Sequence, residues 1–238
     1  MKTDIPVSIS AQPDNTTCGP TCLKTIYNFY DDNISLEQVI DEVPTLLDGG
    51  TLGAWLAMHA LKRGYRATIY SYNLNLFDPT WYGEEAAFIK QKLVNQAALK
   101  GDPKLKQVTE AYIAFLDAGG ELEFEVLQPS LIRSFLNKGI PILTGLSATF
   151  LYRSKRELGT DNEYDDLRGE PVGHFVVLHG YDRETKTVMV ADPLLENPLA
   201  KGHQYEIEIN RVINAILLSI VTYDANLIII RRPEKTGL

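Results

Sequence analysis

Residues 12–22 read QPDNTTCGPTC, and this stretch is the best guide to the fold. Residues 13–15 have the composition of a turn. Beyond them a helix is predicted over residues 18–30, because apolar side chains recur with a helical period at positions 22, 23, 26, 29 and 30. Thr16 or Thr17 is expected to cap this helix. The stretch therefore places Cys18 in the first turn of a helix.

A cysteine in that position is a candidate nucleophile. The positive end of a helix dipole stabilises the thiolate, which is the reactive form of the side chain. A thiolate nucleophile works with a base, and the base works with a group that orients it. The chain offers four histidines as candidate bases: His59, His174, His179 and His203.

His174 stands near the start of a strongly apolar segment that predicts a strand over residues 173–181. A second predicted strand, 187–191, ends at Asp192, and the residues between the two strands suit a hairpin turn. In an antiparallel hairpin, positions 174 and 192 meet at the open end. Asp192 is then predicted to hold one ring nitrogen of His174 while the other faces Cys18, in a nucleophile–base–orienter arrangement.

Such a reaction also needs donors for the oxyanion that forms on the substrate. The backbone N–H of Cys18 is one candidate, and the side-chain amide of Gln12 is a plausible second. Each donor of this kind contributes roughly 3 kcal/mol to transition-state stabilisation. The predicted site is therefore Cys18, His174, Asp192 and Gln12.

The remaining pattern predicts a single α+β domain over residues 1–238, with helices early and antiparallel strands late. Residues 83–118 read as an inserted helical hairpin broken at Gly101-Asp102-Pro103. Residues 152–170 are polar and highly charged, which is typical of a long lid or binding loop. Other helices are predicted at 35–43, 51–63, 129–137 and 211–220, and other strands at 5–10, 65–72, 122–126, 140–145, 205–209 and 227–231.

Composition limits the classes of function. The formal net charge is -8 and 45% of the residues are hydrophobic, so a soluble globular chain without a broad nucleic-acid surface is expected. No apolar run of about 18 residues predicts a membrane span, and the first residues lack the apolar segment of a signal peptide. Two cysteines make no disulfide framework, which favours a reducing, cytoplasmic setting. The oligomeric state cannot be inferred from the sequence.

Three motifs together resemble a known family. They are Q-x5-C-G-P at 12–20, G-H-F-V-V-L-H-G-Y-D at 173–182 and V-A-D-P at 190–193. The combination resembles the papain-like cysteine peptidases, and within them the bacteriocin-processing, double-glycine-leader peptidases and their stand-alone relatives. The resemblance extends from about residue 8 to about residue 195.

The resemblance implies a papain-like fold, a helical part that carries the cysteine, and a C-terminal antiparallel sheet. It implies that Cys18 is the nucleophile, His174 the base, Asp192 the orienting residue and Gln12 the oxyanion glutamine. It also implies a peptide or amide substrate and no cofactor. The hairpin at 83–118 and the loop at 152–170 depart from the compact family pattern, as does the absence of an attached transporter.

The same residues also allow other interpretations. Cys22 lies one turn further along the helix and is expected in the core. A zinc site formed by Cys18, Cys22 and two histidines is disfavoured, because C-x3-C is not a usual zinc spacing. Asp182 is a rival orienter, but it belongs at the hairpin turn. The remaining histidines are expected to be structural or surface residues: His59, His179 and His203.

Three functions remain open. The first is a thiol hydrolase that cleaves a peptide or amide bond. The second is transglutaminase-like or acyltransferase chemistry, in which an amine replaces water. The third is a peptidase fold that has lost catalysis and serves as a binding module. The acidic run at 161–166 is expected to be a solvated loop, or alternatively a selector of basic substrates.

Overall fold

The computed structural model describes residues 2–46, 49–159 and 163–233. Its helices are α1 (Cys18–Phe29), α2 (Leu36–Glu42), α3 (Gly53–Lys62), α4 (Ala86–Lys100), α5 (Pro103–Asp117), α6 (Pro129–Leu136), α7 (Ala148–Tyr152) and α8 (Ile209–Leu218), with 3-10 turns η1 (Pro79–Trp81) and η2 (Ser219–Thr222). Its strands are β1 (Lys2–Asp4), β2 (Arg66–Ser71), β3 (Glu121–Glu123), β4 (Ile142–Ser147), β5 (Glu157–Leu158), β6 (Glu163–Tyr164), β7 (Gly173–Asp182), β8 (Thr187–Ala191), β9 (Gln204–Glu208) and β10 (Asn226–Arg231).

The strands of the main sheet run in the order β3-β2-β10-β4-β7-β8-β9, and β1 pairs with the far end of β7. The pairs are antiparallel except for β2 and β3, which are joined through the helical hairpin and run parallel. The last strand of the chain, β10, therefore lies inside the sheet, between β2 and β4. The predicted α+β class, with a mostly antiparallel sheet, is confirmed.

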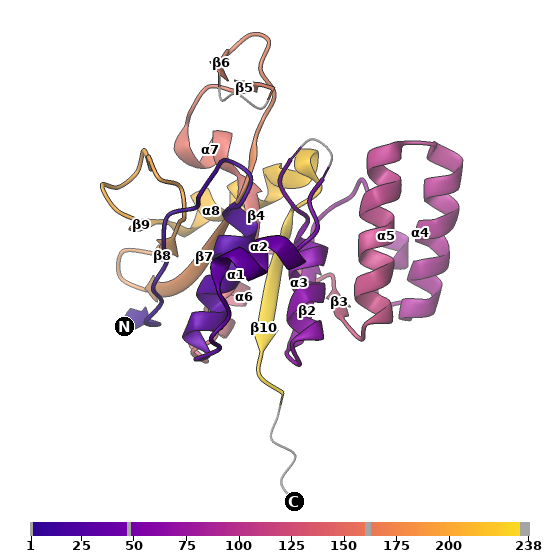
Figure 1. The fold of residues 1–238 in the computed structure, drawn as a ribbon, viewed down its shortest axis with the longest axis horizontal. Coiled ribbons are helices and arrows are strands. Elements are labelled where there is room, and N and C mark those ends of the chain that lie inside the picture. Colours follow the sequence, from indigo (N-terminus) through magenta and orange to yellow (C-terminus); the bar gives the residue numbers. More distant parts are fainter. Residues whose placement is uncertain (1, 47–48, 160–162, 234–238) are drawn as a thin grey trace, which may run out of the picture.

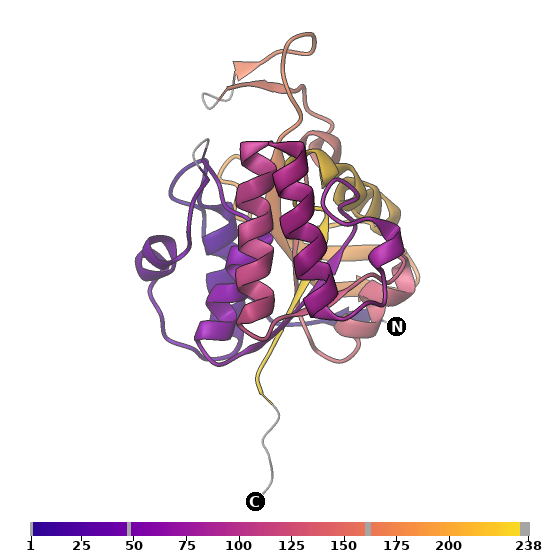
Figure 2. The same cartoon turned by 90° about the vertical axis from the view of Figure 1, so that its right-hand side faces the viewer.

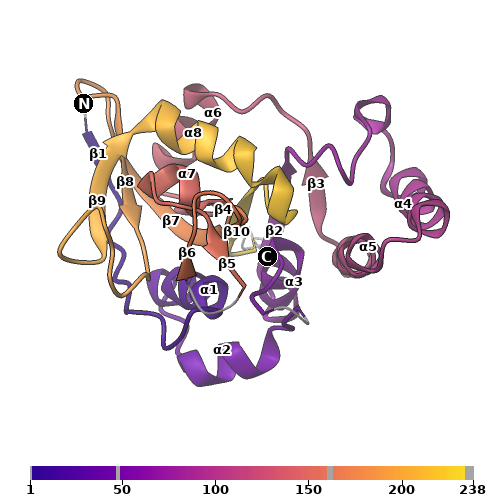
Figure 3. The same cartoon turned by 90° about the horizontal axis from the view of Figure 1, so that it is seen from above.

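Helices cover both faces of this sheet (Figures 1 and 3), which explains why its central strands carry apolar residues toward both faces. One core joins α1, α2, α3 and α5 to the face that carries Phe175 and Val177. The other joins α6 and α8 to the face that carries Val176 and Leu178. Successive residues of β7 thus enter opposite cores. All six residues of β4 are buried, as the apolar run at 140–145 predicts.

Helix α1 follows its predicted range closely and packs against β7. Its polar contacts differ from those expected at the N-terminus. Thr17 occupies the N-cap position, but its hydroxyl donates to the Asp14 carbonyl and makes no cap hydrogen bond. The Asp14 carboxylate instead accepts from the backbone N–H and the hydroxyl of Thr16. The turn at residues 13–16 therefore organises its own polar groups and leaves the start of α1 without a side-chain cap.

The helical hairpin of α4 and α5 forms as the sequence predicts (Figure 2). It breaks where Gly101 adopts a left-handed conformation. Asp102 then caps α5 by accepting from the N–H groups of Lys104 and Leu105. The apolar stripe of α5 packs on α3 and includes Tyr112 and Phe115, both buried. Helix α5 is thus part of the first core, and the description of 83–118 as an insertion stays a prediction.

Two segments differ from expectation. The strand predicted at 5–10 is wrong: β1 precedes it, and after Ile5 donates to the His179 carbonyl (2.8 Å) the chain leaves the sheet at Pro6, which has no N–H for the ladder. Residues 152–170, expected to be a loop, begin with the last residue of α7 and contain the short β5–β6 pair, which projects from the body (Figure 1). Asp161, in the predicted acidic run, lies outside the described residues.

Candidate active site

The hairpin of β7 and β8 brings two distant polar residues together. The strands pair from Asp182 opposite Thr187 to Val177 opposite Ala191, and the turn lies between them as predicted. At the open end, His174 Nε2 lies 2.9 Å from Asp192 Oδ1. Both side chains are buried, and Asp192 has no exposed surface. The structure thus places His174 and Asp192 in contact, at the position that the strand pattern predicts.

Cys18 is the first residue of α1 and is buried. Backbone N–H groups in the first turn of a helix have no intrahelical acceptor, so this end of α1 favours negative charge. The thiol interacts with His174 and contributes to the raised pKa of that side chain. Because His174 Nε2 is taken by Asp192, Nδ1 is the ring nitrogen left for the sulfur.

His174 and Asp192 each change the pKa of the other. Burial lowers the pKa of His174, but the Asp192 carboxylate and then Cys18 outweigh it and raise this pKa to about 10. Burial alone would raise the pKa of Asp192. The charge of His174, together with its hydrogen bond and that of Tyr152, instead lowers it to about 2. At neutral pH the pair is therefore a buried imidazolium beside a carboxylate.

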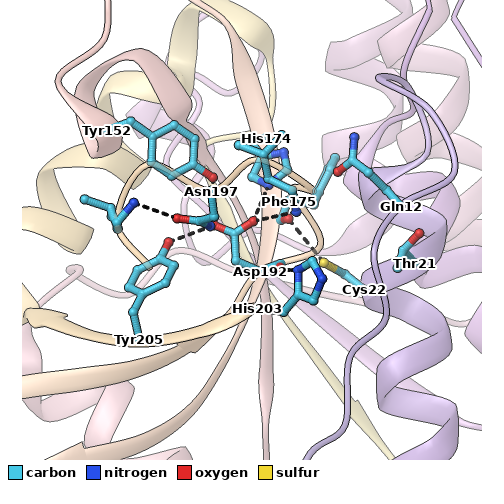
Figure 4. A network of polar contacts seen from close by, with 12 residues as sticks. Gln12, Thr21, Cys22, Tyr152, His174, Phe175, Asp192, Asn197, His203 and Tyr205 are labelled. Carbon is cyan, nitrogen blue, oxygen red and sulfur yellow. Dashed lines mark hydrogen bonds and ion pairs between the residues drawn. The ribbon is translucent and has the colours of Figure 1, made fainter. Parts of the chain in front are cut away.

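Gln12 is tied to the same region through its backbone. Its N–H donates to the carbonyl of Pro193 (2.9 Å), the residue after Asp192. Its side chain is buried, and Nε2 donates to the Asp14 carbonyl (2.7 Å) while Oε1 has no partner among the described residues. Figure 4 shows Gln12 on the α1 side of the site, across from His174 and Asp192. One hydrogen of the Gln12 amide is therefore used in the bond to the Asp14 carbonyl, and the other is not needed for that bond.

The sequence did not indicate two tyrosines that bind Asp192. Tyr152 donates to Asp192 Oδ2 (2.7 Å) and Tyr205 donates to the same oxygen (2.8 Å). Tyr152 falls at the edge of the segment predicted as a loop, so no strand or helix pattern linked it to the site. Tyr205 belongs to a predicted strand, and its approach to Asp192 follows from the pairing of β9 with β8, which sequence periodicity does not reveal.

The remaining cysteine, histidines and Asp182 lie away from the His174–Asp192 contact, except for His203, which bonds the backbone of Asp192. Cys22 is fully buried, and its thiol donates to the Phe175 carbonyl (3.2 Å), as expected for a core residue. His59 bonds Tyr27 and Glu42, and His179 bonds the Ile5 carbonyl, both away from Asp192. His203, expected to be structural, contacts the Asp192 carbonyl through Nδ1 (3.1 Å). Asp182 receives the N–H of Glu184 at the turn.

Among the described residues, no group of three or more His, Cys, Asp or Glu side chains is arranged to hold an ion. Cys18 and Cys22 are not joined to each other. Within the same residues, no helix is both long and apolar enough to cross a bilayer.

Comparison with known families identifies the chain. A model of the Peptidase C39 family matches residues 7–93, and a model of the Peptidase C39-like family matches residues 103–215. The chain belongs to the C39 peptidase family. It is accordingly a papain-like cysteine peptidase, as the three sequence motifs suggested. The two matches include all four predicted site residues, and their boundary falls in the α4–α5 hairpin.

Solved structures resemble this C39 peptidase over nearly its whole length. A protein described as a C39-like peptidase from Bacillus anthracis has 14% identity and a TM-score of 0.52, covering 99% of this chain and 100% of that one, and at this identity the similarity concerns the fold alone. The peptidase domain of Streptococcus ComA (12%, TM-score 0.45) covers 94% and 98% of the respective chains. Xylellain from Xylella fastidiosa (16%, TM-score 0.43) covers 98% and 86%. No curated protein matches the chain.

Proposed function

We propose that this C39 peptidase hydrolyses a peptide bond with Cys18 as nucleophile, His174 as acid and base, and Asp192 as the group that orients His174. The observation that carries the proposal is the buried contact of His174 Nε2 with Asp192 Oδ1 (2.9 Å) beside a cysteine that begins a helix. The ion pair leaves Nδ1 of His174 as the proton carrier toward the sulfur. Geometry and charge therefore favour a thiolate at Cys18.

The reaction follows from these positions. The Cys18 thiolate attacks the substrate carbonyl, and the developing oxyanion is stabilised by nearby N–H donors. The His174 imidazolium gives its proton to the leaving amine, which departs and leaves a thioester on Cys18. Water then attacks the thioester while neutral His174 accepts a proton from it. Collapse of the second tetrahedral intermediate releases the acid and restores the thiolate–imidazolium pair.

For the oxyanion, we propose the Cys18 backbone N–H and the Gln12 side-chain amide. Cys18 lies in the helix turn whose N–H groups lack intrahelical acceptors. Gln12 is held near Asp192 by its bond to Pro193, and its amide keeps one hydrogen beyond the bond to Asp14. Gln12→Ala is expected to lower kcat by about 10²-fold with little change in KM, because the donor acts mainly on the transition state.

The same intermediate also permits transfer to an amine. A thioester on Cys18 reacts with whichever nucleophile reaches it, so hydrolysis and acyl transfer share their first half. The proposal takes water as the acceptor, and added amine nucleophiles separate the alternatives. A free thiol of this kind has to stay reduced, so we place the reaction in a reducing compartment, the cytoplasm.

The experiment is a cleavage profile on a peptide library with mass-spectrometric product analysis. The wild-type chain should release two peptide fragments, and Cys18→Ala should reduce turnover by about 10³-fold or more. Cys22→Ala is the matched control, since it removes the neighbouring thiol on the same helix and should retain turnover. Amide products formed only with added amine would instead support transfer. Turnover that survives in Cys18→Ala would contradict the proposal.

A further inference from the structure

Asp192 accepts hydrogen bonds at both oxygens from side chains and backbone. Oδ1 receives His174 Nε2 (2.9 Å) and the N–H of Leu194 (3.0 Å). Oδ2 receives the hydroxyls of Tyr152 (2.7 Å) and Tyr205 (2.8 Å). A carboxylate has about four acceptor sites, so the four donors saturate it. Figure 4 shows the two tyrosines converging on Asp192 from the side away from α1.

We propose that Tyr152 and Tyr205 are positioning residues for the peptidase reaction, which hold Asp192 ionised and in one orientation so that it can fix His174. The proposal rests on the function proposed above. We call these two hydroxyls, Tyr152 and Tyr205, the tyrosine clamp. Neither needs to touch substrate; each acts through Asp192.

Burial makes the clamp necessary. Asp192 has no exposed surface, and an ionised carboxylate removed from water is costly unless donors replace its hydration. His174 supplies a counter-charge on Oδ1 only. Without the tyrosines Oδ2 would be a buried charged oxygen lacking any partner, and the carboxylate would be free to rotate about χ2 or to take up a proton. Both tyrosines stay protonated donors, because burial and then Asp192 raise their pKa values.

The clamp is built on elements that are hydrogen-bonded to the segments carrying His174 and Asp192. Helix α7 is tied to the start of β7, since Ala148 N–H donates to the Val172 carbonyl (2.9 Å) and Val172 N–H donates to the Thr149 hydroxyl (3.0 Å). Arg211 of α8 donates to the Leu151 carbonyl, next to Tyr152. The Tyr152 ring also lies tilted against the His174 ring, with centroids 6.2 Å apart.

Tyr205 is fixed from the other side. It pairs with Val190 in the β8–β9 ladder, so its strand is directly bonded to the strand that ends at Asp192. The backbone of Asp192 is hydrogen-bonded to His203, since its N–H donates to the His203 carbonyl (2.8 Å) and its carbonyl faces His203 Nδ1.

Other titratable or charged groups also face this cluster: Cys18 and Cys22 from α1 toward His174 and Asp192, Arg211 from α8 toward Tyr205, and Glu157 from β5 toward His174.

The test compares Tyr152→Phe, Tyr205→Phe and the double variant with the parent. Each single change removes one donor from Oδ2, so Asp192 takes up a proton at higher pH and His174 loses its counter-charge. We expect kcat/KM to fall about tenfold for each single variant through kcat, with KM nearly constant. In the pH profiles of kcat/KM and of Cys18 alkylation by iodoacetamide, the rate falls at low pH, and this fall is called the acidic limb. It should move to higher pH by up to about one unit.

The matched control is Tyr65→Phe. Tyr65 also donates to a carboxylate, Asp32 Oδ2 (3.1 Å), but these two residues follow the C-terminal ends of α3 and α1, whereas Cys18 begins α1. The change should therefore alter neither kcat nor the acidic limb. Replacing Tyr205 with 3,5-difluorotyrosine keeps the hydroxyl and makes it a stronger donor, and should move the limb to lower pH. This variant retains the ring and keeps the test informative if a phenylalanine variant does not fold.

The outcomes are separable. If the parent cleaves no peptide, the proposed function is contradicted. Alkylation of Cys18 does not require turnover, so the shift of its acidic limb between the parent and the tyrosine variants still tests the role of the tyrosine clamp. If the limb and kcat stay unchanged in the double variant and only thermal stability falls, the tyrosines merely satisfy a buried carboxylate and the proposal is overturned. An equal effect of Tyr65→Phe would overturn it as well.

Discussion

His174 and Asp192 are both withdrawn from water, and each stabilises the charge on the other. The contact of 2.9 Å decides the ionisation of the pair, because the attraction outweighs the burial of each group. His179 shows the reverse: burial lowers its pKa despite its bond to the Ile5 carbonyl and the exposed carboxylate of Asp4, which lies 3.5 Å from its Nδ1. The chemistry of the site therefore depends on pairing, with burial making the pairing strong.

This pairing predicts how stability depends on pH. The folded-state pKa of His174 is raised from 6.5 to about 10, so its contribution is complete below pH 6.5 and is lost as the pH rises toward 10. The pKa of Asp192 is lowered from 3.8 to about 2, so its contribution is complete above pH 3.8. Urea unfolding of wild type and His174→Gln should differ most near pH 5, by on the order of 2–4 kcal/mol. A constant difference from pH 5 to pH 10 would contradict the ion pair.

The burial of Cys22 predicts how its removal affects stability and labelling. Its thiol is fully buried and donates to the Phe175 carbonyl, and burial raises its pKa well above the usual value. Cys22→Ala should lower the free energy of unfolding by about 1 kcal/mol through lost packing and one lost hydrogen bond. Alkylation under native conditions should still label one thiol per chain. Two equally reactive thiols in wild type would mean that Cys22 is not in the core.

The residues of the site were predictable to different degrees. His174 and Asp192 follow from strand ends and a hairpin turn, because antiparallel pairing makes their meeting a matter of register. The position of Gln12 near them depends on one backbone bond to Pro193, which no local pattern encodes. The tyrosines that bind Asp192 come from α7 and β9, so finding them required the order of the strands.

Among the secondary-structure elements, the β7–β8 hairpin contributes most to the site, because it brings His174 and Asp192 together. Its register shifts between Leu178 and Gly180, so His179 is an extra residue in the ladder. This bulge lies where β1 joins β7, and it leaves the open end at His174 undisturbed. The helices were predicted well where an apolar stripe coincides with a stop signal, as in α3 and Gly64. Helix α7 is short and follows a buried strand directly, so periodicity could not reveal it.

A second buried carboxyl, that of Asp224 just before β10, contacts the start of α3 and behaves in the opposite way. Asp224 accepts from the N–H of Gly53 (2.8 Å) and from Asn226 (3.3 Å), and the charge of Lys104 also favours its ionised form. Burial raises its pKa from 3.8 to about 7, against the effect of those donors. The folded chain therefore holds a proton that the unfolded chain releases above pH 4.

That difference predicts a loss of stability as the pH rises from about 4 to about 7, where the buried carboxyl ionises. The loss should be roughly 4 kcal/mol at most, from a shift of about three units. Asp224→Asn cannot ionise, so its free energy of unfolding should exceed that of wild type at pH 8 and lack this decline. Thermal unfolding from pH 4 to pH 8 measures it. Parallel curves for the two proteins would show that Asp224 is ionised at all these pH values.

For the whole molecule, two cores on one sheet explain both the stability and the arrangement of the site. The cysteine helix packs on one face, and the tyrosines of α7 and β9 approach from beside the other. The α+β class was predictable from helices early and strands late. The strand order could not be predicted, because β10, which comes last among the strands in the sequence, lies between β2 and β4 in the sheet.

The β5–β6 pair, within the range 152–170, projects beyond both cores (Figure 1). Of the described residues in this range, Leu167 and Tyr164 are exposed, so the segment adds little to either core. Replacing residues 155–168 by a short Gly-Ser linker should leave the unfolding temperature within a few degrees of wild type. If the segment restricts access to the site, the library profile should broaden. An unchanged profile would show that it does not select substrate.

Cys18 and His174 are proposed to form a thiolate–imidazolium pair. The most direct test is the rate of Cys18 alkylation by iodoacetamide from pH 3 to pH 10, in Cys22→Ala and in Cys22→Ala with His174→Ala. The pair predicts fast alkylation well below the pKa of an ordinary thiol, and loss of this low-pH reactivity when His174 is removed. Two identical curves, each rising only near the pKa of a free cysteine, would contradict the claim.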